Sequence, residues 1–227
     1  MSTRAVILLA GMGSRLGRPH PKALTHLATG ETILGRQLRI LRGEFGLEVC
    51  AVVGFKMDLI MEAAPDVLFA YNPDYDATNT AKSLLCAMRH LRGHNVLWLN
   101  GDVVFEPAII DLMLKTGESG VAVDNARVGE EEVKYNLNRD GYIREISKKV
   151  ADPLGEALGI NYITAEHVDD FVRKLEQVSD NDYFERAMEL LIQEKGNVFR
   201  PVNVGDLPCI EVDFDADLKR ADQLFKA

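Results

Sequence analysis

A glycine-rich loop with two cations close behind it is the first segment of the sequence that could bind a phosphate chain. The loop, Gly11-Met12-Gly13-Ser14-Arg15-Leu16-Gly17, directly follows the apolar run Ala5–Ala10. Small residues let backbone N–H groups approach phosphate oxygens closely. Lys22 follows in Pro19-His20-Pro21-Lys22, where two prolines stiffen the approach. The residues predicted to contact a nucleotide's phosphates are Ala10, Gly11, Gly13 and Ser14 through the backbone and Arg15 and Lys22 through their charges.

Other phosphate loops compete for this segment. A Walker loop is excluded because no Gly-Lys-Ser/Thr ends it. The dinucleotide fingerprint fits badly, since Leu16 stands where its last glycine belongs and the second strand ends in Val53-Gly54 rather than an acid. A plain strand-to-helix turn with solvated charges is the remaining alternative, and the combination of Gly13, Arg15 and Pro21-Lys22 argues against it.

Carboxylates at two distant places complete the chemistry-bearing set. Asp102 ends the apolar strand 96–99, so its side chain is expected in the crevice at the carboxyl edge of the sheet. Magnesium is usually held by one or two carboxylates plus phosphate oxygens, so a second acid should converge on it. Glu211 and Asp213 share one side of a late strand and supply that pair. The alternatives to metal binding are that Asp102 is a simple turn residue and that Asp213 or Asp215 caps the last helix. Of these two, we expect Asp215 to be the cap.

Composition limits the classes of function. The chain has 227 residues, 47% of them apolar, which suffices for one α/β domain without disulfides. Its 26 basic against 35 acidic residues give a formal charge of −9, so neither nucleic acid nor a membrane surface is an expected partner. Three scattered cysteines predict reduced thiols, and the apolar run Ala5–Ala10 is too short for a signal peptide or a membrane span. A cytoplasmic location is expected.

The order of elements predicts the fold. Buried strands are expected at Ala5–Ala10, Val49–Val53, Val67–Ala70 and Val96–Asn100, with helical apolar spacing between them. This alternation predicts a Rossmann-like, doubly wound α/β fold with a mostly parallel sheet. The second half changes character, with a hairpin at 133–147, a strand at 158–163, helices near 165–177 and 183–194, strands near 198–203 and 209–212, and a final helix from 215. We expect one domain over residues 1–227, in which residues 1–125 bind nucleotide and residues 126–227 bind the acceptor and complete the metal site.

The loop and the lysine behind it resemble a known family. Leu9-Ala10-Gly11-Met12-Gly13-Ser14-Arg15-Leu16 followed by Pro21-Lys22-Ala23-Leu24 is similar to the signature of the sugar-phosphate nucleotidyltransferases, and most of all to their short bacterial branch typified by CTP:phosphocholine cytidylyltransferase. That branch also includes inositol-phosphate and phosphonate cytidylyltransferases. The resemblance implies that the loop wraps a triphosphate, that Arg15 and Lys22 neutralise it, and that Asp102 with the Glu211-x-Asp213 pair holds Mg²⁺.

The resemblance also implies contacts to the base and the acceptor. Asn72, Asn79 and Ser83 match the stretch that contacts nucleotide, although the last two are equally suited to capping a helix. The chain departs from the phosphocholine branch here, because Lys82 stands where aromatic residues are expected. A quaternary ammonium needs an aromatic cage, and a lysine facing the site would repel it and welcome an anion. Lys82, Lys148, Lys149 and Glu156 are the predicted acceptor-binding residues, with a solvated lysine pair as the alternative for Lys148 and Lys149.

Together these features predict a magnesium-dependent nucleotidyltransferase that joins a nucleoside triphosphate, CTP by resemblance, to a small phosphorylated or phosphonate acceptor. Because a phosphate monoester has its second pKa near ~6, the attacking group needs no general base. A sugar-1-phosphate acceptor, a nucleotide-binding protein without activity and a dinucleotide-dependent oxidoreductase are the alternatives. Exposed helices could form the interface of a homodimer.

Overall fold

The computed structural model describes residues 2–12, 20–125, 128–129 and 132–226. The strands of these ranges are β1 Thr3–Leu9, β2 Glu48–Val53, β3 Leu68–Tyr71, β4 Asn95–Asn100, β5 Val103–Phe105, β6 Gly120–Asp124, β7 Lys134–Leu137, β8 Ile143–Ser147, β9 Gly155–Ile163, β10 Arg200–Asn203 and β11 Cys209–Glu211. The helices are α1 Ile33–Leu38, α2 Met57–Ala63, α3 Thr80–Met88, α4 Pro107–Lys115, α5 Ala165–Gln177, α6 Phe184–Lys195 and α7 Asp215–Leu224. A 3₁₀ turn covers Lys22–Leu24, and a π-helical turn, Arg39–Glu44, continues α1.

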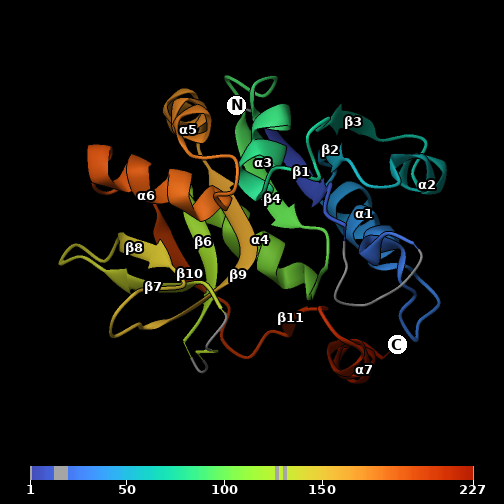
Figure 1. The fold of residues 1–227 in the computed structure, drawn as a ribbon. Helices are drawn as coiled ribbons and strands as arrows, with labels where there is room; N and C mark the ends of the chain where they lie inside the picture. Colours follow the sequence, from blue (N-terminus) through green and yellow to red (C-terminus); the bar gives the residue numbers. More distant parts are fainter. Residues whose placement is uncertain (1, 13–19, 126–127, 130–131, 227) are drawn as a thin grey trace.

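A mixed, mostly parallel sheet forms the centre of the molecule (Figure 1). Its main path runs β10-β6-β9-β4-β1-β2-β3, and the β7–β8 hairpin attaches to it through β9. β1 is parallel to both β2 and β4, whereas β9 is antiparallel to β4 and to β6. The parallel core and the later antiparallel addition confirm the predicted α/β fold class. The carboxyl ends of β1 and β4, where Ala10 and Asp102 follow, therefore lie at the same edge.

Helices cover both faces of this sheet because successive side chains of its buried strands point in opposite directions. Val6 and Leu8 of β1 pack into one apolar cluster with α3, α5 and α6, centred on Trp98. Ile7 and Leu9 pack into the other cluster with α1 and α4. Trp98 stacks on Phe171 of α5 at 5.4 Å between ring centroids, and α5 lies beside α6 in Figure 1. β1 is thus buried on both faces, as its continuous apolar run predicts.

A third, smaller apolar cluster attaches the C-terminal segment to this body. β11 pairs antiparallel with β5 in a separate two-stranded sheet. Ile210 and Val212 pack there with Val104 and with Phe225, the residue that follows α7. Helix α7 lies next to the C terminus in Figure 1. The cluster fixes where the chain between Glu211 and Asp213 runs, more than a hundred residues after Asp102.

Several elements differ from the sequence-based expectation. The expectation omitted α2, β5, α4 and β6, although Pro107 at the first position of α4 is a recognised helix-start signal. Asp215 is the first residue of α7 rather than its cap, so that expectation was wrong. The N-cap is Phe214, whose amide donates to Asp217 Oδ2 at 2.8 Å.

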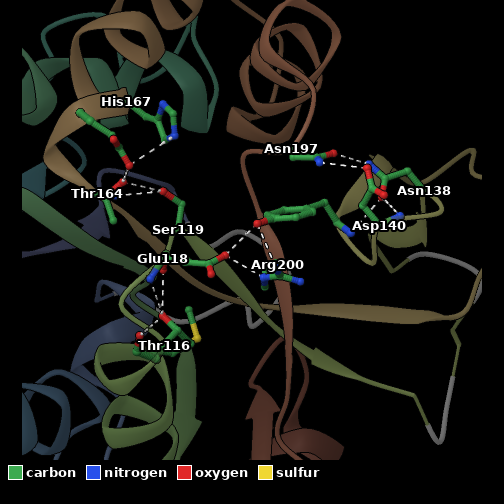
Figure 2. Close-up of polar contacts among 12 residues, drawn as sticks. Thr116, Glu118, Ser119, Asn138, Asp140, Thr164, His167, Asn197 and Arg200 are labelled. Atoms are coloured by element: carbon green, nitrogen blue, oxygen red, sulfur yellow. Dashed lines mark hydrogen bonds and ion pairs between the residues drawn. The ribbon is translucent and has the colours of Figure 1, made fainter.

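A polar network on the outer part of the sheet joins β10 to the segment before β6 and to the hairpin (Figure 2). Arg200 Nε donates to Glu118 Oε2 at 2.7 Å, and the guanidinium lies 4.0 Å from the centroid of the Tyr142 ring. Asn138 and Asp140 of the hairpin turn both bond to Asn197. These contacts hold the antiparallel addition against the parallel body.

Among the described residues, no helix has the length and apolar character that crossing a membrane requires.

We predict that Gly101→Ala destabilises the fold at the edge where Asp102 lies. A Cβ at Gly101 would stand 2.6 Å from the Leu8 carbonyl oxygen and 2.3 Å from Leu9 Cδ2, so β1 and β4 would have to separate. Overpacking of this kind costs about 1–3 kcal/mol. Chemical denaturation measures it, with Gly43→Ala as the control, because a Cβ there meets only Arg39 Cγ at 3.9 Å. Equal stability of the two variants would contradict the close approach.

Candidate active site

Lys22 lies between two carboxylates that come from distant parts of the chain. Its Nζ is 2.6 Å from Asp102 Oδ2 and 2.5 Å from Asp213 Oδ1. All three side chains are mostly buried, with 12%, 20% and 25% of their surface exposed. Burial alone would lower the pKa of Lys22, but the charges of Asp102 and Asp213 and the hydrogen bonds to them outweigh it and raise the pKa. Lys22 is therefore a fixed positive charge at neutral pH.

Backbone contacts hold the two acidic segments side by side. The Val212 amide donates to the Asp102 carbonyl at 3.0 Å, which sets Glu211 and Asp213 on either side of that contact. On the opposite side, buried Gln37 of α1 donates through Nε2 to the carbonyls of Asn100 and Val103 at 3.0 and 2.8 Å. The turn that carries Asp102 is thereby bonded from both α1 and the C-terminal segment.

The three acids suit a divalent cation. Asp102, Glu211 and Asp213 each offer one oxygen, and these oxygens lie within 4.8 Å of one another. Asp102 Oδ1 is buried without a hydrogen-bond partner among the described residues, as a carboxylate oxygen awaiting a cation would be. Loss of water around the Glu211 carboxyl, together with the charges of Asp102 and Asp213, raises the pKa of Glu211 to about 8. The donor set is all oxygen, the chemistry that Mg²⁺ prefers.

This ionic cluster opens into a cavity of about 300 Å³ at the carboxyl edge of the sheet. Ala10 and Gly11 line it beside Lys22, Asp102, Glu211 and Asp213. The predicted phosphate-binding residues Gly13, Ser14 and Arg15 lie outside the described residues. The volume of the cavity is at the lower end of the range for small-molecule sites. The cavity lies at the carboxyl ends of the strands, where α/β sheets bind their ligands.

The N-terminus of α3 forms another wall of the cavity. Asn79 and Ser83 line it, and Asn79 is also the N-cap of α3, since its Oδ1 accepts from the Thr80 amide at 2.8 Å. Buried Asn72 lies behind this wall and is not among the described lining residues. Its Nδ2 donates to Thr78 Oγ1 and Ser83 Oγ, each at 3.0 Å. Asn72 thus positions the loop before α3 rather than reaching the cavity itself.

Lys82 does not face the cavity. Its Nζ donates to the carbonyls of Leu175, Glu176 and Val178 at 3.1, 3.2 and 2.7 Å, which places it at the C-terminus of α5. A lysine there satisfies carbonyls that the helix leaves unpaired. The predicted acceptor contact of Lys82 is corrected accordingly, and with it the argument that Lys82 would repel a cationic acceptor.

The remaining predicted acceptor residues separate into two groups. Lys148 lines the cavity, with its Nζ 5.5 Å from the centroid of the Tyr183 ring. Lys149 is exposed on the same turn and is not among the described lining residues. Glu156, also outside the lining set, accepts from the Gly129 amide through Oε2 at 3.0 Å. The structure therefore brings Lys148 to the site, while Lys149 and Glu156 lie away from it.

The cavity also has lining residues that sequence reasoning missed. Tyr75 lies in the loop after β3, Glu132 precedes β7, and Tyr183 and Glu185 begin α6. Burial raises the pKa of Glu185 to about 7, although its own amide and Lys148 act in the opposite direction. An acid in the first turn of a predicted helix is ordinarily read as a dipole partner, so no sequence signal distinguished Glu185.

The chain matches a family model and curated proteins. A model described as the MobA-like NTP transferase domain matches residues 5–177. CMP-5'-(3-aminopropyl)phosphonate synthase of Streptomyces rubellomurinus is 32% identical over 244 aligned residues, which cover 98% of this chain and 38% of that protein. The bifunctional protein GlmU of Ruthia magnifica is 30% identical over 122 residues, 52% of this chain and 26% of that protein. The chain thus spans well under half the length of these relatives.

Solved structures share the fold. The CTP:phosphocholine cytidylyltransferase of Streptococcus pneumoniae superposes with a TM-score of 0.76 at 18% identity and covers 100% of both chains. The inositol-1-phosphate CTP transferase of T. maritima superposes with a TM-score of 0.77 at 17% identity, covering 100% of this chain and 97% of the other.

We predict that Lys82→Met lowers the free energy of unfolding by about 1–3 kcal/mol, because three carbonyls lose a charged donor. The Michaelis constant for the acceptor should change less than about twofold, within the ~0.5 kcal/mol typical of changes away from a site. Lys115→Met is the matched control, since Lys115 makes only an exposed ion pair with Asp111. A large rise in the acceptor's Michaelis constant without loss of stability would show instead that Lys82 binds the acceptor.

We predict that Glu185→Gln stabilises the protein at alkaline pH. The folded pKa of about 7 exceeds the ordinary value of 4.5, so the folded state binds the proton more tightly than the unfolded state. The free energy of unfolding of the native chain should therefore fall as pH rises from about 4.5 to about 7. At pH 8 the variant should be more stable by about 1–3 kcal/mol. Thermal melts at pH 5 and pH 8 measure this, and a pH-independent difference would contradict it.

Proposed function

We propose that the chain, which belongs to the MobA-like NTP transferase domain family, transfers CMP from CTP to a small phosphonate or phosphate acceptor and releases pyrophosphate. The observation that carries this proposal is the Lys22 ammonium bonded between Asp102 and Asp213 beside the Ala10–Gly11 segment. That arrangement combines a fixed cation, a cation-binding acid cluster and a glycine backbone in one cavity. These are the parts that nucleotidyl transfer needs.

The choice of base and acceptor rests on the relatives. The phosphonate synthase that aligns with 98% of the chain is named for a CMP-linked phosphonate product. Both cytidylyltransferases whose structures share the fold are named for CTP. The cavity of about 300 Å³ also favours a small acceptor.

In the proposed reaction, an oxygen of the acceptor's phosphonate or phosphate attacks the α-phosphorus of CTP. A bond forms between that oxygen and the phosphorus as the bond to the bridging oxygen breaks, and pyrophosphate leaves with the electron pair. Repulsion between two anions is the main obstacle. Lys22 offsets charge on the α-phosphate, and the Gly11 backbone lies where it can approach phosphate oxygens. The attacking oxygen is already deprotonated at neutral pH, so no basic side chain is required.

Asp102, Asp213 and Glu211 are the proposed ligands of a divalent ion, magnesium in this proposal. When bound, the ion would supply positive charge that further reduces the repulsion between CTP and the acceptor. Lys22 already bonds two of these acids, so it and the metal would share them.

A matrix of substrates tests the proposal. Pyrophosphate release is measured with each of the four nucleoside triphosphates against 3-aminopropylphosphonate, phosphocholine, inositol phosphate and sugar-1-phosphates, with Mg²⁺ and with EDTA. CTP with a small phosphonate or phosphate should give the highest rate, and EDTA should abolish it. A higher rate with a sugar-1-phosphate and another nucleotide would replace this proposal with the sugar-phosphate alternative.

We predict that Lys22→Ala and Asp102→Asn each lower kcat by about 10²–10³, the usual cost of losing one electrostatic contact to the reacting phosphates. The exposed pair Lys115–Asp111 provides matched controls, Lys115→Ala and Asp111→Asn, which should retain native turnover. Circular dichroism shows whether each variant is folded. Near-native turnover in a Lys22 or Asp102 variant would remove that residue from the reaction.

A further inference from the structure

One carboxylate in the cavity has no assignment in the reaction described above. Glu185 lies in the first turn of α6 and lines the cavity, and its Oε2 is buried without a hydrogen-bond partner among the described residues. A buried carboxylate oxygen without a partner is costly to keep. The cost is ordinarily recovered when a ligand supplies the missing donor.

The start of α6 is held rigidly against the wall formed by α3. The Phe184 amide donates to Thr80 Oγ1 at 3.2 Å, and the Asn79 amide donates to the carbonyl of Asp180 at 2.8 Å. Thr80 and Phe184 both line the cavity. Glu185 is therefore presented to the cavity by two helix ends that are bonded to each other, and not by a free loop.

The Tyr183 ring lines the same cavity as Glu185 and lies close to an alkylammonium group of the chain itself. Lys148 Nζ lies 5.5 Å from the centroid of the Tyr183 ring, and its charge acts on the Glu185 carboxyl. Tyr183 as a residue is 46% exposed. Lys148 itself is exposed, on the turn after β8. A ring face beside a carboxylate is a favourable place for an ammonium group.

The charges of the cavity also favour a cationic group at the Glu185 end. Among the described lining residues, five acids face two lysines. Three of those acids, Asp102, Glu211 and Asp213, surround Lys22 and form the proposed metal site. The other charged residues of this described lining are the acids Glu132 and Glu185 and the base Lys148, so this part of the lining is formally net negative. Complementarity favours a ligand whose second end is positive.

We propose that the acceptor is a zwitterion, with a primary ammonium group that Glu185 and the Tyr183 ring bind while its phosphonate or phosphate faces Lys22. The inference rests on the proposed function and assigns the specificity of its acceptor end. Glu185 is in this view a substrate-binding residue and takes no part in bond making. A carboxylate that merely caps α6 would affect stability without affecting the choice of acceptor.

The test compares two acceptors that differ only at the far end, 3-aminopropylphosphonate and n-butylphosphonate, in which a methyl replaces the ammonium. Pyrophosphate release from CTP gives kcat/KM for each, and their ratio is the readout. The native ratio should favour the amino acceptor by about tenfold or more, and Glu185→Gln should reduce that ratio by about tenfold to a hundredfold, since hydrogen bonds to charged groups are worth that much. The loss should appear mainly in KM of the amino acceptor.

Three further variants test the interpretation. Tyr183→Leu should also reduce the ratio, whereas Tyr183→Phe should keep it because the ring remains. Glu166→Gln is the matched control, since Glu166 holds the same second position in α5 as Glu185 does in α6 and should keep the native ratio. An unchanged ratio in Glu185→Gln, with active enzyme, overturns this inference and leaves the proposed function intact. Activity with other small acceptors but none with 3-aminopropylphosphonate also overturns this inference. No pyrophosphate release from the native chain with any small phosphonate or phosphate contradicts the proposed function, and the inference falls with it.

Discussion

The ion pairs that Lys22 makes with Asp102 and Asp213 join the three segments on which the candidate site depends. Three carboxylates whose oxygens lie within 4.8 Å repel one another, so their proximity requires positive charge and a rigid backbone. Lys22 supplies charge from the turn after the first strand. The β5–β11 pair, the small cluster around Val212 and the buried Gln37 amide supply the rigidity. A fold that relaxed any of these would disperse the acids.

The same organisation explains why the cavity has two chemically different ends. The parallel half of the sheet brings the glycine segment and Asp102 to one edge, because the carboxyl ends of β1 and β4 coincide there. The antiparallel addition brings α6 and the turn after β8 to the opposite wall, where Tyr183, Glu185 and Lys148 lie. In the proposed function, the first end takes the triphosphate and the second end selects the acceptor. Nucleotide binding and acceptor selection would then be separated along the chain as well as in space.

How much of this could be predicted depends on whether a residue's position follows from local sequence. Ala10 and Asp102 come at the ends of buried strands, and parallel strands fix which edge they share. Lys22 comes later, in the 3₁₀ turn beyond the glycine-rich segment, and the two prolines before it and its place in the motif are the signals for it. Asp213 is placed by its alternation with Glu211; β11 ends at Glu211, but Asp213 still lies close to it, beyond buried Val212. Glu185 and Tyr183 could not be placed, because their approach to the cavity depends on how α6 packs against α3, a long-range contact. Lys82 has an exposed-looking sequence environment, yet the C-terminus of α5, about ninety residues away, provides its carbonyl partners. Tertiary contacts decided these cases.

The central claim is that the Lys22–Asp102–Asp213 cluster binds a triphosphate together with a divalent ion. Calorimetry tests it most directly, by measuring the affinity of the chain for a non-hydrolysable CTP analogue with and without Mg²⁺. The account predicts at least about tenfold tighter binding with the ion, because about 1.4 kcal/mol or more of binding free energy should come from charge that the acids hold in place. Equal affinity with and without Mg²⁺ would contradict it.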